Sequence, residues 1–588
     1  WLTGCEKLGK LFCWPCLLFS TVEKNVRNTS GFSDLNNLHK MMKRHSNGKS
    51  HLEAVFKQKR FGTLRIEHAL DRQLKEDHRR HNEMVRKNRE IVKRLIDVTC
   101  FLGEHELSFR GHNEEEASVN RGNYVDLLNL LAKYDPILSN HLEQSTVFRG
   151  TSNRIQNDII KSIAAVVSNR VKAEITDAKF VSVVMDETTD IKNQSQLSIV
   201  LRYVTKGGNV EERFIDFLNI TSDRSADALY NILQNILDEY KCGHKLIGQS
   251  YDGAAVMSGH LGGLQAKVKE TYKNALFVHC FAHRLNLVLS QSVSQIKDCK
   301  VFFTTLSGMA AFFSKSTKRT SALDEVIQKR LPRVAPTRWN YNGRLVETVY
   351  QYRQPLIDFF QIIVNEKNWD AETINSSRGY LDLLLNDFNF NFLLVVFASI
   401  FPFTDVLFGI LQTKTNDIGY CIDKINEFQS KIQEKRNEFE EFWQRVNDLG
   451  INVHRKRPRT TDQEDTQISY RRLFIEIMDN ISGQLTNRFK EFGDLKFLEL
   501  TNFCYKKNVP DQAFNCLKKT YGNFFDMVAL QAQLSVLYEL PEINDIKNCA
   551  KVFTFLKQNE LDTTYSEVSK LCELVLTIPA TSASVERS

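Results

Sequence analysis

The pattern of apolar residues changes at Phe180, and this change constrains the fold more than any other feature. The run FVSVVMD, which ends at Asp186, is rich in β-branched residues and predicts a buried strand. The elements predicted from here, in order, are strands at 180–186, 196–204 and 210–220, a helix at 229–240, a strand at 245–251, a helix at 264–271, a strand at 276–280 and a helix from Ala282. Their order, βββαβαβα, predicts an α/β domain whose first three strands form an antiparallel meander.

The rest of the chain is predicted to be helical. Ten prolines occur in 588 residues, and two long intervals contain none. Apolar residues recur at helical spacing over 64–95, 124–133 and 155–175, and helical patterns prevail from 290 to 534. At roughly 100 to 200 residues per domain, we expect three to five domains.

One helical segment is unusually apolar. The run from Phe392 to Phe403 lies in a helical pattern that extends to Leu411, but Pro402 and Asp405 interrupt its apolar character. About a dozen apolar residues have the length of a buried core helix and are too few to span a bilayer. We therefore expect no membrane span.

Charge and cysteine content indicate which partners and which cellular compartment suit this protein. The net charge of +7 permits a polyanionic partner without requiring one. A basic run from His454 to Arg459 is either a solvated loop or a contact for phosphates or for the nuclear import machinery. Twelve scattered cysteines are too sparse for a disulfide scaffold, so we expect an intracellular protein.

Four potential zinc ligands lie near the N-terminus: Cys13, Cys16, His45 and His51. Two thiolates in a Cys-x-x-Cys turn and two imidazoles complete a tetrahedral, structural zinc site. Cys5 or His39 is an alternative to one ligand, and a chance pair of core cysteines with solvated histidines is the alternative to the whole site. Basic residues that could contact phosphates surround the site: Lys40, Lys43, Arg44 and Lys49.

Two acids follow predicted strands. Asp186 ends the first strand and Asp252 follows the fourth. If these strands are neighbours, their carboxylates converge at one sheet edge, as a hard divalent cation requires. Taken singly, an acid after a strand is more often a helix cap or a turn residue.

Five strings, in this order, resemble the hAT superfamily of DNA transposases, in the group with an N-terminal TTF-type zinc finger similar to zinc finger MYM-type proteins: VVMDETTD, GQSYDGAAVMSG, HCFAHRLNL, PTRWN and PATSASVER. The resemblance implies a ribonuclease H-like catalytic core interrupted by a large all-helical insertion. It also implies a catalytic triad of Asp186, Asp252 and Glu586 that holds Mg²⁺ or Mn²⁺ and cuts and joins DNA.

The resemblance assigns further residues to DNA. Cys280 and His283 match a Cys-x-x-His pair placed beside the active site, with the histidine near DNA. Arg338 and Trp339 match an Arg-Trp motif whose tryptophan stacks on a flipped base. A buried cysteine with a helix-start histidine, and a core tryptophan, are the structural alternatives.

The resemblance divides the chain as follows: a TTF-type zinc finger at 1–55, a helical N-terminal region at 56–178, the first part of the ribonuclease H-like core at 179–290, an all-helical insertion at 291–535, and the end of the core with the hAT dimerisation motif at 536–588. It implies a nuclear protein that binds double-stranded DNA, both transposon ends and target, as a homo-oligomer. Because the chain starts at Trp1 and ends two residues after Glu586, we expect both ends to be cut and this fragment to be inactive or poorly active.

Two other functional classes stay open. One is a host-adopted, non-catalytic zinc-finger DNA-binding or chromatin protein derived from such a transposase. The other is a ribonuclease H-like nuclease that cuts nucleic acid without joining ends to a target.

Overall fold

The structure is a computed structural model that describes residues 1–21, 29–61, 72–112, 118, 120–146, 148–190, 192–332, 340–366, 368–451, 462–490, 493–503, 508–543, 546 and 548–582. The chain forms two compact units, Trp1–Val166 and Val167–Ser588. Each is described by itself.

The first unit begins with a small hairpin and short helices. Its elements are β1 (Leu2–Cys5), β2 (Lys10–Cys13), α1 (Trp14–Phe19), α2 (Leu38–Ser46), α3 (Lys49–Arg60), α5 (Arg72–Glu104), α6 (Asn123–Ala132) and α7 (Pro136–Gln144), and α8 (Asn153–Asp177) continues into the second unit. β1 and β2 pair antiparallel, with Gly9 at a positive φ of 59° in the turn between them. The sequence analysis missed this hairpin.

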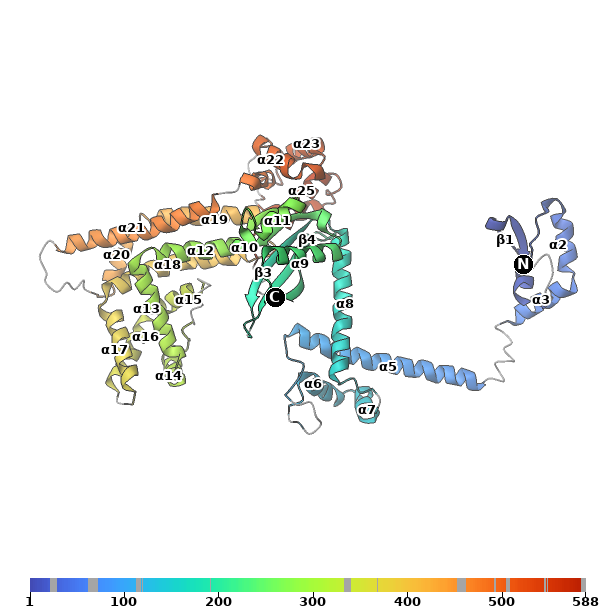
Figure 1. The fold of residues 1–588 in the computed structure, drawn as a ribbon, viewed down its shortest axis with the longest axis horizontal. Helices are drawn as coiled ribbons and strands as arrows, with labels where there is room; N and C mark the ends of the chain where they lie inside the picture. The colour runs from blue at the N-terminus through green and yellow to red at the C-terminus, as the bar shows by residue number, and fades with distance from the viewer. Residues whose placement is uncertain are drawn as a thin grey trace. The chain divides into compact units, whose positions relative to one another are not determined.

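The second unit is built on a five-stranded mixed sheet (Figure 1). Its elements are β3 (Val181–Thr189), β4 (Ser195–Val204), β5 (Val210–Asn219), α9 (Ala226–Glu239), β6 (Leu246–Tyr251), α10 (Ala255–Ser258), α11 (Leu264–Thr271), β7 (Leu276–His279) and α12 (Phe281–Ser294). The strands lie in the order β5-β4-β3-β6-β7, with β3, β4 and β5 antiparallel and β6 and β7 parallel to their neighbours. Apart from the short helix α10, this is the predicted element order.

The two faces of the sheet differ in side-chain size. One face carries large apolar residues of β3 and β4, including Val183 and Leu201, which pack against α8, α9 and α11. The opposite face carries small buried residues, including Ser182, Ser198 and Gly248. A Cβ added to Gly248 would lie 2.5 Å from the Oγ of Ser182, so only glycine fits there.

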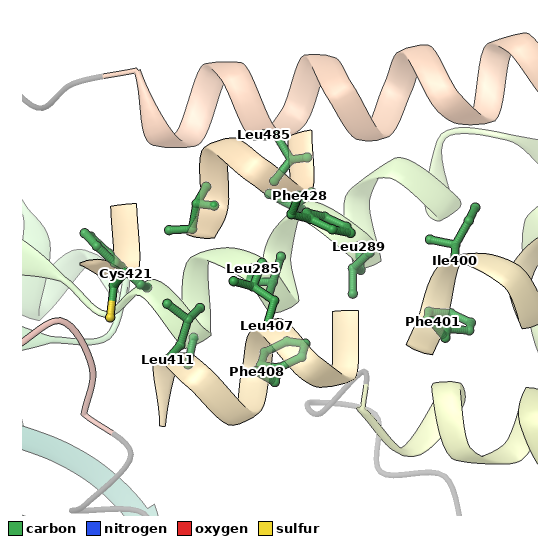
Figure 2. Close-up of a cluster of buried hydrophobic side chains, with 14 of the residues drawn as sticks. Leu285, Leu289, Ile400, Phe401, Leu407, Phe408, Leu411, Cys421, Phe428 and Leu485 are labelled. Carbon is green, nitrogen blue, oxygen red and sulfur yellow. The ribbon is translucent and has the colours of Figure 1, made fainter. Parts of the chain in front are cut away.

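Helices fill the chain after α12. They are α13 (Lys297–Ser314), α14 (Thr317–Ile327), α15 (Asn340–Gln351), α16 (Arg353–Asn365), α17 (Ala371–Asn386), α18 (Phe388–Leu411), α19 (Ile418–Lys435), α20 (Phe439–Asn447), α21 (Asp462–Phe489), α22 (Asp511–Tyr521), α23 (Met527–Tyr538), α24 (Cys549–Gln558) and α25 (Ser566–Thr577). Helices α12, α18, α19 and α21 pack side by side. Figure 2 shows their shared core, to which α12 contributes Leu285 and Leu289 and α21 contributes Leu485.

Helix α18 begins four residues before the predicted helix, at Phe388 instead of Phe392, and ends at Leu411 as predicted. It continues through Pro402 to Leu411, and buried residues on both sides of the proline, such as Phe401 and Leu407, pack into the core of Figure 2. The burial of these side chains accounts for the helix continuing despite the hydrogen bond that proline removes. Among the described helices, α18 alone is long and apolar enough to cross a membrane, and 56% of its most apolar stretch is buried inside the fold. Its apolar composition is therefore explained by its place in this core.

The C-terminal part of the chain returns to the sheet. Helix α25 contacts β4 and β6. Pro579 comes just after this helix. Its Cδ lies 3.5 Å from the position that a Cβ on Gly248 would occupy, so the proline packs against this glycine. Ile578, Ala580 and Ser582 are buried, so the small-residue face of the sheet is covered by a segment far away in the sequence.

The chain is therefore a mixed α/β protein of mainly helical content. Five strands form the main sheet, two form the N-terminal hairpin, and helices make up most of the rest of the described chain.

Candidate functional site

The four N-terminal ligand candidates converge. One ligand atom each of Cys13, Cys16, His45 and His51 lies within 4.8 Å of all the others, and all four residues are buried. The two cysteines flank the start of α1, His45 lies near the end of α2 and His51 in the first turn of α3. Neither Cys5 nor His39 belongs to this group. No other compact group of three or more metal-ligating side chains occurs in the part of the chain that the structure describes.

The distances within the group fit a tetrahedral zinc ion. The Cys13 Sγ lies 3.2 Å from the Nδ1 of His51, and the Cys16 Sγ lies 3.4 Å from the Nε2 of His45. Zinc bonds of about 2.3 Å to sulfur and about 2.0 to 2.1 Å to nitrogen, set at the tetrahedral angle, separate the two atoms by about 3.6 Å. The donor set thus fits zinc, held by Nδ1 of one imidazole and Nε2 of the other.

Burial and an aromatic cover favour metal binding. Burial lowers the pKa of the His51 imidazole, which favours the neutral form that a metal needs. The Trp1 indole packs against both imidazole rings, with ring centroids 5.2 Å from His45 and 5.0 Å from His51. Sequence reasoning missed this role of Trp1 because it concerned only the sulfur and nitrogen ligands.

The outer surface of this small domain carries positive charge. Lys40, Lys43 and Arg44 on α2, and Lys49 at the start of α3, are exposed. None of the four forms an ion pair with a carboxylate among the residues that the structure describes. Their charges are therefore available to a polyanion.

The two aspartates lie on neighbouring strands. β3 and β6 are parallel, and Val184 lies opposite Ser250. Asp186 comes two residues after Val184 within β3, and Asp252 directly follows the last residue of β6. Because side chains alternate along a strand, Asp186 belongs to the face that carries Val184. Both aspartates are half-buried.

A turn contact and an ion pair lie at this acidic edge. The carboxylate of Asp252 accepts a hydrogen bond from the N–H of Ala254 at 3.1 Å, which is a turn contact. Glu187, next to Asp186, forms an ion pair with Arg224. The predicted third acid, Glu586, lies outside the described residues, as do Arg338 and Trp339.

Cys280 joins the C-terminal segment to this edge. Its buried Sγ accepts hydrogen bonds from the N–H of Ser582 at 3.3 Å and from the N–H of His283 at 3.5 Å. Next to it, the N–H of Phe281 donates to the carbonyl oxygen of Ala580 at 2.9 Å. The thiol therefore helps to position residues 580–582, and the DNA contact of Cys280 stays a prediction.

Two histidines flank Cys280. The ring centroids of His279 and His283 lie 5.7 Å apart, and His283 is half-buried. Burial, aided by the positive charges of Arg284, His283 and Arg488, lowers the pKa of His279 to about 3. A Cβ on Gly253 would lie 2.7 Å from the His279 ring, so this neutral imidazole packs directly beside Asp252. The string HCFAHR contained both histidines, yet the predicted site used only the second.

Comparisons with known proteins match parts of this chain. Residues 26–263, which include Asp186 and Asp252, match the family model DUF4371, described as "ZMYM1/FAM200, RNase-like domain". The "52 kDa repressor of the inhibitor of the protein kinase" of Homo sapiens is 23% identical over 382 residues, which cover 61% of this chain and 49% of that protein. The Mus musculus protein of the same name is 22% identical over 381 residues, which cover 61% of this chain and 50% of that protein.

A shorter similarity involves another protein. "General transcription factor II-I repeat domain-containing protein 2" of Bos taurus is 27% identical over 131 residues, which cover 22% of this chain and 14% of that protein. The chain spans about half the length of the two repressor proteins. Residues 26–263 are thus related to the RNase-like domain of the ZMYM1/FAM200 type, and the chain is a homologue of the 52 kDa repressor proteins.

Proposed function

We propose that this chain is a zinc-finger DNA-binding protein with a core derived from a hAT transposase, and that it acts in the nucleus as a regulator of transcription. The convergence of Cys13, Cys16, His45 and His51 within 4.8 Å carries the proposal. The match to an RNase-like domain and the names of the relatives, a repressor and a general transcription factor repeat protein, support the transposase-derived origin and the regulatory role.

Zinc would act here as a structural ion that joins the hairpin to two helices. The buried apolar core around the ligands is small, with Ala54 and Phe19 as its other members. Such a domain depends on its metal to fold. Once zinc holds them in place, α2 and α3 present four basic residues on one small domain: Lys40, Lys43, Arg44 and Lys49. These side chains can neutralise DNA phosphates.

The experiment compares the zinc-loaded full chain with the Cys13→Ser variant. Zinc content is measured by mass spectrometry, and affinity for a labelled DNA duplex by fluorescence anisotropy between about 50 and 200 mM salt. We expect the variant to lose its zinc and to bind DNA at least tenfold more weakly, with a reduced salt dependence. Cys100→Ser is the matched control, because Cys100 is exposed on α5 and is not a ligand.

Two results would overturn the proposal. One is a wild-type chain that carries no zinc after expression in zinc-supplemented medium. The other is a Cys13→Ser variant that binds DNA with the wild-type affinity and salt slope.

A second candidate function is DNA cleavage and strand transfer by Asp186, Asp252 and Glu586 with Mg²⁺ or Mn²⁺. The specific observation in its favour is the parallel pairing of β3 and β6, which places Val184 opposite Ser250, two residues before each aspartate. Carboxylates at this edge suit a hard divalent cation, which would polarise a scissile phosphate and activate the attacking hydroxyl.

The second candidate is tested by incubating the full chain with a DNA duplex and Mg²⁺ or Mn²⁺. Products that appear in wild type and disappear in Asp186→Asn and Asp252→Asn would establish cleavage, and joining of the cut ends to a target would separate a transposase from a simple nuclease. Asp190→Asn is the control, because Asp190 directly follows β3 and its carboxylate accepts hydrogen bonds from the turn residues Lys192 and Gln194 and from Gln196 on β4. Equal activity in all variants, or none in wild type, would exclude this candidate.

The proposal includes a homo-oligomer formed through the C-terminal motif. Light scattering on the full chain and on a chain shortened after Ser582 measures the mass directly. We expect the shortened chain to be monomeric at concentrations at which the full chain is not.

A further inference from the structure

We propose that the groove between α18 and α19 is an interface between two copies of this chain, which pack there with their α19 helices antiparallel. The inference goes beyond the proposed function, because it concerns a contact on a surface separate from the C-terminal motif. The occupant of each groove is the same groove of a second copy.

The groove is open to solvent and its floor is apolar. It has a volume of about 630 Å³, and Leu407 of α18 and Phe428 of α19 are among the residues that line it. Both side chains are buried and also belong to the core of Figure 2. Because the packing of the two helices holds the floor in place, the groove is a fixed feature of this surface.

One rim of the groove exposes apolar side chains of α18. Val406 is 65% exposed and Phe403 is 36% exposed, and both line the groove. Ile410, four residues after Val406, lines it as well and lies on the same face of the helix. Apolar side chains that are exposed side by side mark interaction surfaces, whereas single ones are common on any protein. A partner that covers this rim removes the side chains from water.

The other rim consists of charged residues of α19. Lys424 and Glu427 form one ion pair at 2.7 Å, and Lys431 and Glu434 form another at 2.8 Å. Their spacing of three, four and three residues places all four on one face of the helix. Exposed pairs of this kind add little to the stability of a fold. They do place four charges of alternating sign along the rim.

The order of these charges is complementary to its own reverse. Lys424 and Glu434 lie equally far from Gln429, on opposite sides, and so do Glu427 and Lys431. When two copies of α19 pack antiparallel with Gln429 at the centre, Lys424 therefore faces Glu434 of the second copy. Glu427 likewise faces Lys431 of the second copy, so all four charges of each helix meet an opposite charge.

This complementarity identifies the occupant and its direction. In a parallel packing in register, each charge would meet its own like charge, which opposes binding. A two-fold axis across the helices makes the packing antiparallel and lays the apolar floor of one groove over that of the other. An interface of this kind needs one self-complementary surface, and the two rims of this groove supply it.

The test uses two full-chain variants with opposite changes in charge. The first carries Lys424→Glu and Lys431→Glu, and the second carries Glu427→Lys and Glu434→Lys. Each variant alone places like charges opposite each other, so we expect its association constant at this surface to fall by about tenfold or more. An equimolar mixture of the two variants should associate at least as well as wild type, because opposite charges again face each other.

Sedimentation velocity over a range of protein concentrations measures the mass of each protein and of the mixture. Lys518→Glu with Lys519→Glu is the matched control, because it makes the same change in charge at exposed positions on α22. We expect this control to have the mass of wild type. Val406→Glu should also lose the association, while Val528→Glu, at an 82% exposed position on α23, should keep it. Because both valines are exposed, neither change should lower the melting temperature.

The C-terminal motif is unchanged in every variant, so the two contacts can be told apart. We expect the groove contact to be the weaker one and to appear as a separate increase in mass at higher concentration. If the C-terminal proposal fails, this increase remains and is the first to appear. Wild-type mass in each charge variant by itself would overturn the inference. A mixture that stays as small as its two components would overturn it as well.

Discussion

The Nε of Arg202 donates a hydrogen bond of 2.9 Å to the carbonyl oxygen of Leu576, a residue 374 positions later in the sequence. Through it β4 is bound to the last turn of α25. The same buried guanidinium donates to the carboxylate of Glu212 on β5 and to the carbonyl oxygen of Lys414 after α18. One side chain thus joins the sheet to two segments of the helical region.

Replacing Arg202 with Met should destabilise the second unit by about 3 to 5 kcal/mol, because Glu212 would be left buried without its cation. The melting temperature of that unit, followed by calorimetry, measures the effect. Lys206→Met removes an exposed ion pair between the turn after β4 and Asp177 at the end of α8, and it should cost less than about 1 kcal/mol. The double variant Arg202→Met with Glu212→Met should be more stable than Arg202→Met alone, and a less stable double variant would contradict this account.

Replacing Cys280 with Ala should loosen the C-terminal segment, because the N–H of Ser582 loses its buried acceptor, at a cost of about 1 to 3 kcal/mol. Hydrogen exchange followed by mass spectrometry should show faster exchange in a peptide that covers residues 578–588. Cys242→Ala is the control, since Cys242 is equally buried and packs on the other face of the sheet. Equal exchange rates in the two variants would rule out a positioning role for Cys280.

His279 should make the second unit sensitive to acid. Its pKa of about 3 in the fold lies below the unfolded value of about 6.5, so its contribution to stability is full above pH 6.5 and falls as the pH drops toward 3. Between pH 6.5 and pH 5 the loss amounts to roughly 1 to 2 kcal/mol. Melting temperatures at several pH values should therefore fall less in His279→Gln than in wild type. The exposed control His260→Gln should follow wild type, and identical pH profiles for all three proteins would refute the prediction.

Removing the Trp1 indole should weaken zinc binding about tenfold, because the ring covers both histidine ligands. Competition against a coloured chelator, with Trp1→Ala compared to wild type, gives the affinity directly. Trp14→Ala should bind zinc normally, since the Trp14 side chain is 48% exposed beside the site. If both variants retain the wild-type affinity, the indole has no part in holding the metal.

The strands and the zinc ligands could be predicted because their signals are local. The β-branched run that ends at Asp186 became β3, and the Cys-x-x-Cys pair came together with His45 and His51. The β1–β2 hairpin was missed because strands of four residues are too short to show a period.

Long-range contacts left no comparable pattern in the sequence. Cys280 and Ser582 are 302 positions apart, and Arg488 and Gln291 are 197 apart. Each contact depends on how α12 packs against distant helices, which no local period records. No local pattern therefore predicted that the Cys280 thiol accepts a hydrogen bond from Ser582 or that Arg488 donates one to Gln291.

The distance in sequence between the sheet and its cover has a consequence during protein synthesis. When β4 leaves the ribosome, α25 has not yet been made, and at about 5 to 20 residues per second the intervening 374 residues take roughly 20 to 75 s. During that time the face of the sheet that carries Ser182, Ser198 and Gly248 is exposed to water. We expect this interval to be covered by chaperones, and truncation before α25 to yield an aggregating product instead of a smaller folded domain.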